Sequence, residues 1–107
     1  MIVSLLLAAL LSDAPAPPAR AELCLAHVNA MIAEAARETG RVAGPSWFIR
    51  SWWETRLPED GASGALTAEQ REALEASMPD RRTADPDTHT AALQSCVDEA
   101  IEGGALP

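Results

Sequence analysis

An apolar segment opens the chain, since nine of residues 2–11 are Leu, Ala, Ile or Val. A run of about ten such residues has the length of a signal-peptide core and is too short for a membrane-spanning helix, which needs about 20. Small residues at Ala19 and Ala21 suit a signal peptidase that cuts between Ala21 and Glu22. The sequence therefore predicts that residues 1–21 are a signal peptide, that 22–107 form one small domain, and that the protein is exported, either to a periplasm or by secretion.

The predicted signal lacks one usual feature. No Lys or Arg precedes the apolar run, so the α-amino group of Met1 supplies its only positive charge. The alternative interpretation is an apolar N-terminus that is retained and packs on the rest of the protein. Lipid attachment at Cys24 is disfavoured because Leu23, which is not a small residue, precedes it. Once the signal is removed, the sequence predicts no stable membrane anchor.

Cys24 and Cys96 are the only cysteines, and both lie in the predicted mature domain. An oxidising compartment would join them. Each falls on the apolar stripe of a predicted helix, and a bridge needs two Cβ atoms that face each other about 4 Å apart. A closed loop of about 72 residues would stabilise the fold by about 4.4 kcal/mol through the entropy of the unfolded chain. We therefore predict a Cys24–Cys96 disulfide that supplies much of the stability of so small a domain.

Apolar residues recur at spacings of three and four along the mature part, which predicts an all-α fold of four short helices. The first helix is expected over about 22–39, with Gly40 as its stop. The second should begin with Ser46 as its N-cap and end near Leu57, before a proline. The disulfide would join the first and last helices, with the second packed across them.

Two further helices are indicated by their caps. Thr67 and Gln70 have the spacing of a capping box and predict the start of the third helix. Its inward face should consist of Leu66, Ala73, Leu74 and Met78. Asp85, followed by a proline, predicts the N-cap of the fourth helix, which runs to residue 102. The charged segment 80–83 between them is expected to be an exposed connector.

Every aromatic residue except the histidines lies in the predicted second helix: Trp47, Phe48, Trp52 and Trp53. Large aromatic side chains can fill the core of a small domain, or they can form a contact surface, because Trp is enriched where proteins bind one another. Trp47, Trp52 and Trp53 are therefore the candidate contact surface, with the core as the alternative. Trp47 flanks the apolar stripe and should be the most exposed of the three.

The charge of the chain narrows the choice of partners. The chain has eight Arg and no Lys but 16 Asp and Glu, so its net charge is −8. A surface this acidic repels phosphate backbones and anionic lipid headgroups, so neither nucleic acid nor a membrane surface is an expected partner. A protein partner is compatible with this charge.

The residues that could carry chemistry are few. Cys24, Cys96, His27 and His89 have the composition of a zinc site, but His89 and Cys96 lie about 10 Å apart along one helix, too far for a single tetrahedral ion. No serine has a hydrolase context, so neither a catalytic residue nor a cofactor is predicted. The expected function is that of a binding or accessory protein. The alternative is a small exported enzyme or metal-dependent module that uses His27 or His89.

Overall fold

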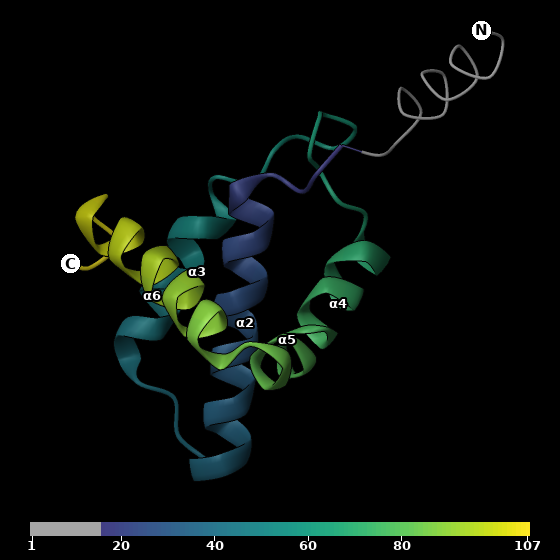
Figure 1. The fold of residues 1–107 in the computed structure, drawn as a ribbon. Helices are drawn as coiled ribbons and strands as arrows, with labels where there is room; N and C mark the ends of the chain where they lie inside the picture. The colour runs from purple at the N-terminus through teal and green to yellow at the C-terminus, as the bar shows by residue number, and fades with distance from the viewer. Residues whose placement is uncertain (1–15) are drawn as a thin grey trace, which may run out of the picture.

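The computed structural model describes residues 16–107, which fold into helices without a β-strand and so confirm the all-α class (Figure 1). The first 15 residues, which hold most of the predicted signal peptide, lie outside the described part. The helices are α2 (Arg20–Thr39), α3 (Gly44–Glu54), α4 (Ala68–Ala76), α5 (Met78–Ala84) and α6 (Pro86–Glu102).

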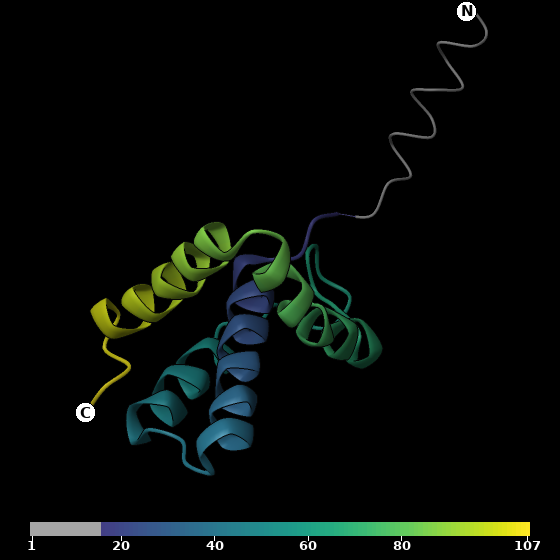
Figure 2. The same ribbon diagram turned by 60° about the horizontal axis from the view of Figure 1, so that its bottom comes forward.

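The longest helix, α2, runs through the middle of the fold. The two views place α3 and α6 on one side of it and α4 and α5 on the other (Figures 1 and 2). Each of the other helices described contacts α2, whereas α3 and α4 share no direct packing. Within residues 16–107, the domain therefore has two sides that meet only through α2 and the junction of α5 with α6.

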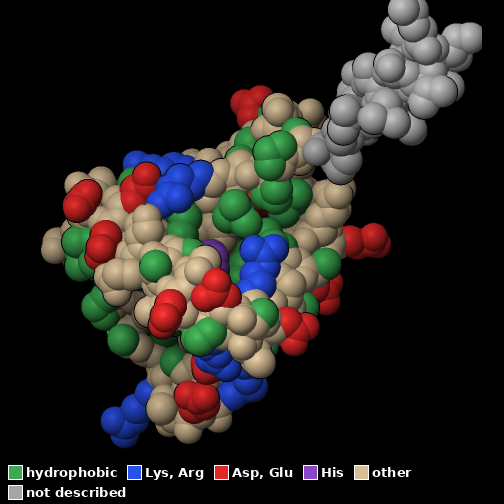
Figure 3. Space-filling view, viewed as in Figure 1, with side chains coloured by type: hydrophobic (Ala, Val, Ile, Leu, Met, Phe, Trp, Pro, Cys, Tyr) green, Lys and Arg blue, Asp and Glu red, His purple; other side chains and the backbone are tan. Residues whose placement is uncertain are grey.

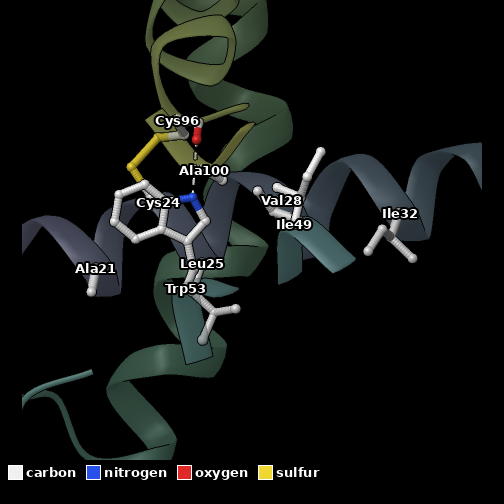
Figure 4. Packing of buried hydrophobic residues seen from close by; sticks show 9 residues of the cluster. All are labelled: Ala21, Cys24, Leu25, Val28, Ile32, Ile49, Trp53, Cys96 and Ala100. Carbon is white, nitrogen blue, oxygen red and sulfur yellow. Dashed lines mark hydrogen bonds between the residues drawn. A yellow bond between two sulfur atoms is a disulfide. The ribbon is translucent and has the colours of Figure 1, made fainter. Parts of the chain in front are cut away.

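The apolar core lies between α2, α3 and α6 (Figure 4). The disulfide predicted from the sequence is present: Cys24 of α2 is bonded to Cys96 of α6, and their Cα atoms are 5.3 Å apart. The indole Nε1 of Trp53 donates a hydrogen bond of 3.0 Å to the carbonyl oxygen of Cys96, which ties α3 to the bridge. The buried residues of this cluster are Ala21, Cys24, Leu25, Val28, Ile32, Ile49, Trp53, Cys96 and Ala100.

Several predicted helix ends are confirmed. Gly40 caps α2 in the left-handed conformation, at φ 69°, which a glycine adopts without strain. Thr67 and Gln70 form the complete capping box at the start of α4. The carboxylate of Asp85 accepts the backbone N–H of Thr88 at the start of α6. Each cap satisfies helix-end groups that would otherwise have no partner.

Three local predictions are wrong. Ser46 lies inside α3, and Ala43 is the N-cap, because Pro45 fits the first turn of a helix and lets α3 begin earlier. The same helix ends at Glu54, before the expected Leu57. Segment 80–83 is exposed as expected, but it belongs to α5, a further short helix beyond the four predicted. Pro79 stands in its first turn, where a proline is tolerated, and so starts a helix where the sequence indicated a connector.

The inward face predicted for the third helix forms only in part. Met78 is buried as expected, but it begins α5, and within α4 Leu74 is half-buried while Ala73 is exposed. A polar contact also holds α4 to α2. Arg71 donates to both carboxylate oxygens of Glu22, from Nε at 2.7 Å and from Nη2 at 2.9 Å.

Glu22 is the most buried charged residue of the described chain, with its side chain fully excluded from solvent. Besides Arg71, its carboxylate accepts the backbone N–H of Leu66 at 2.8 Å, just before α4. Burial by itself raises the pKa of Glu22, but the hydrogen bonds from Arg71 and Leu66 outweigh it and hold the pKa below its usual value. Glu22 is therefore an ionised anchor for the start of α4.

Candidate functional site

The structure brings the two histidines of the chain together. His27 of α2 and His89 of α6 have ring centroids 5.0 Å apart, with their planes tilted by 51°. The sequence grouped them only within a Cys2His2 composition, which the distance from His89 to Cys96 disfavours as a zinc site. The bridge supplies the signal that could have found the pair: His27 lies one turn after Cys24 and His89 two turns before Cys96. The disulfide that joins α2 to α6 therefore also brings the two histidines close together.

The histidine pair lines a cleft of about 350 Å³ between α2, α4, α5 and α6. This volume lies at the lower end of the range for small-molecule sites. Apolar side chains of Met31, Met78 and Leu93 form part of the lining. In the space-filling view, histidine surface shows inside a hollow bordered by apolar and arginine side chains (Figure 3). The two imidazole rings thus line a cleft beside α4, a helix that has no buried residue.

Charged residues also line the cleft: Glu34, Arg37, Glu72, Glu75 and Arg82. Arg82 of α5 is paired with Glu34 of α2 through a hydrogen-bonded ion pair, which joins these helices across the opening. The hydrogen bond from Arg82, which outweighs partial burial, lowers the pKa of Glu34. The cleft therefore presents both signs of charge beside an apolar wall.

His27 is 7 % exposed and His89 is half-buried. The Nδ1 atoms of both rings are buried and have no hydrogen-bond partner in the described part of the chain. Burial, followed by the charges of His89 and Arg81, lowers the pKa of His27. His27 is consequently neutral at pH 7, with a nitrogen lone pair available.

The candidate contact surface has a different composition from the one expected. Trp53 is only 3 % exposed and belongs to the core, and Trp52 is half-buried against it, edge to face with centroids 4.8 Å apart. Trp47 is 46 % exposed, as expected, and the neighbouring Phe48 is 47 % exposed. The exposed aromatic surface of α3 therefore consists of Trp47 and Phe48.

Trp52 of α3 packs against Gly103, the residue that follows α6. Its Nε1 donates to the carbonyl oxygen of Gly103 at 3.3 Å, and a Cβ added to Gly103 would lie 2.2 Å from its ring. Only glycine allows the two to approach this closely. The sequence predicts a fourth helix that runs to residue 102 but does not predict a contact between Gly103 and an indole ring. This contact places the C-terminal segment beside α3.

Ala21 and Glu22, the predicted cleavage positions, lie in the first turns of α2 and are both buried. Just before them, the N–H of Ala19 donates to the carbonyl oxygen of Gly64, and Arg20 is bonded to Glu99. A peptidase needs an accessible extended chain, so a cut between Ala21 and Glu22 has to precede folding. That cut would also remove the contacts of Ala19 and Arg20.

Within residues 16–107, no three side chains of His, Cys, Asp or Glu gather where one metal ion could be held. None of the helices described is both long and apolar enough to cross a bilayer. No family model, no curated protein and no solved structure matches the chain. The site therefore has to be interpreted from its own geometry.

Proposed function

We propose that the chain is an exported binding or accessory protein, not an enzyme, and that it contacts a protein partner through the aromatic surface of α3. The observation that carries this proposal is the exposure of two adjacent large aromatic residues, Trp47 and Phe48, in a domain with a small core. Exposed aromatic side chains of this size are typical of interaction sites, where their burial supplies much of the binding energy.

The charge around this surface indicates the kind of partner. Segment 41–57 carries Arg41, Arg50 and Arg56 against the single acid Glu54, although the whole chain has a net charge of −8. The Arg50 guanidinium carbon lies 5.3 Å from the Trp47 ring centroid, which keeps a cation beside the exposed indole. The partner that fits has an apolar pocket flanked by carboxylates.

Export is supported by the disulfide, since such bonds persist in oxidising compartments and are rare in the cytosol. The intact mass of the protein recovered from the extracytoplasmic fraction tests this part. We expect a chain that begins at Glu22 and carries no free thiol. A cytoplasmic protein that begins at Met1 with two reduced cysteines would contradict export.

The partner surface is tested by affinity capture from the same fraction, with the folded chain as bait. We expect a protein that wild type captures and that the double variant Trp47→Ala/Phe48→Ala loses. Ile101→Ser is the matched control, because it removes exposed apolar area from α6 and leaves α3 intact. Equal loss with the control, or capture that the double variant retains, would overturn the proposal. Sedimentation of the wild type alone shows whether a second copy occupies the surface, which would also contradict a distinct partner.

A further inference from the structure

We propose that His27 and His89 together form a coordination site for a divalent transition-metal ion of the zinc class, with water completing the coordination. The site goes beyond the proposed partner surface, because it lies in the cleft between α2, α4, α5 and α6 and uses no residue of α3. Each proposal can therefore fail without the other.

The separation of the two rings fits this role. An imidazole nitrogen binds zinc at about 2.0–2.1 Å, and the ring centre lies about 1.1 Å behind that nitrogen. Two imidazoles on one tetrahedral ion then have ring centres about 5 Å apart. The centroids of His27 and His89 are 5.0 Å apart, and the 51° tilt keeps the rings from stacking face to face. The backbone thus already holds the rings at the spacing that a shared ion requires.

The state of the rings also fits. Buried polar atoms almost always have a hydrogen-bond partner, yet the Nδ1 atoms of both histidines have none in the described chain. A metal ligand has to offer a nitrogen lone pair, and an Nδ1 atom without a hydrogen-bond partner offers one when the ring carries its proton on Nε2. Two neighbouring imidazoles of this kind are suited to bind one metal ion.

The ligand type selects the ion. Imidazole nitrogen suits zinc, copper and nickel, whereas magnesium and calcium prefer oxygen ligands. Because no third His, Cys, Asp or Glu of the described residues joins the pair, the protein supplies two ligands and leaves the other positions open. Arg81 repels a cation here, while Glu72 and Glu75 of the cleft lining attract one. The affinity therefore depends on the two coordination bonds.

Zn²⁺ alone is the probe, added to the folded, disulfide-bonded chain without a polyhistidine tag at pH 7.5. Competition with a chromogenic chelator measures the affinity, and the ¹⁵N chemical shifts of the imidazoles identify the ligands. We expect saturable binding of one ion per chain, with shifts at one nitrogen of each ring. Zn²⁺ that binds without moving either imidazole, or that shows no saturable binding, would overturn the site.

Two variants keep the test decisive. His89→Gln changes a half-buried residue and should weaken Zn²⁺ binding at least about tenfold, since it removes one of two protein ligands. Thr90→Ala, the neighbouring exposed residue of the same cleft, should leave the affinity unchanged. His27→Asn should abolish binding, and far-UV circular dichroism shows whether this more buried position still folds. Unchanged affinity in a folded His89→Gln variant would overturn the proposal whatever His27→Asn does.

Discussion

The two sides of α2 are held by different kinds of interaction. Toward α3 and α6 the chain packs a continuous apolar cluster, with Trp53 at its centre and the Cys24–Cys96 bridge beside it. Toward α4 and α5 the contacts are mainly ionic, from Glu22 to Arg71 and from Glu34 to Arg82, and Met78 is the buried apolar residue. The cleft with the histidine pair opens on this polar side. The apolar side therefore fixes the positions of the two histidines, whereas the polar side leaves a cleft beside them.

The largest effect should come from the bridge. Replacing both cysteines by alanine (Cys24→Ala/Cys96→Ala) should lower the free energy of unfolding by about 2–5 kcal/mol, because the unfolded chain regains the entropy of a loop of 72 residues. Urea denaturation measures the change, and wild type kept in reductant should match the variant. A loss below about 1 kcal/mol in the free energy of unfolding would show that the disulfide is not a main stabiliser of the apolar side.

The next largest effect on the free energy of unfolding should come from Glu22, which holds α4 to α2. Glu22→Gln should cost about 1–3 kcal/mol, because Arg71 loses its charged partner; the cost is limited since Arg71 reaches solvent. Glu54→Gln breaks the exposed pair with Arg50 within α3 and is the matched control, with an expected cost below about 1 kcal/mol. Equal costs for the two variants in urea denaturation would contradict the special role of Glu22.

A smaller change should follow from the cap of α4. Thr67→Ala removes the side-chain acceptor for the N–H of Gln70 and should cost about 1 kcal/mol. Because α4 has no buried residue, we expect the loss to appear mainly as faster amide exchange within α4. Exchange that quickens equally in α6 would show that the two sides are not separable.

A last effect is the pH dependence of the stability that Glu22 supplies. The pKa of Glu22 is lower in the folded protein than its ordinary value of 4.5, so the ionised carboxylate stabilises the fold above about pH 4.5. That contribution is lost as the pH falls through the lowered pKa. Wild type and Glu22→Gln should therefore differ most in unfolding free energy near pH 7 and converge in acid. A difference that persists undiminished at pH 2 would contradict the assignment.

The sequence predicted the stable side better than the polar side. Periodicity and caps located α2 and α6, and two cysteines on apolar stripes were enough to predict their bridge. The same reasoning turned Ala73 inward, since a small apolar residue at helical spacing does not reveal that Arg71 and Glu22 will hold the helix by charge. The pairing of His27 with His89 follows only when the Cys24–Cys96 bridge is combined with the helical spacing of each histidine from its cysteine.

Native-state hydrogen exchange on the folded, disulfide-bonded chain measures the difference in stability between the two sides of α2. Amides of α3, α6 and the middle of α2 should exchange only through global unfolding, while those of α4 and α5 should exchange through a local opening of lower free energy. Glu22→Gln should lower the free energy of that local opening further. The amides of α6 should still exchange only through global unfolding. Uniform protection across all the helices described, in wild type and variant alike, would contradict the account.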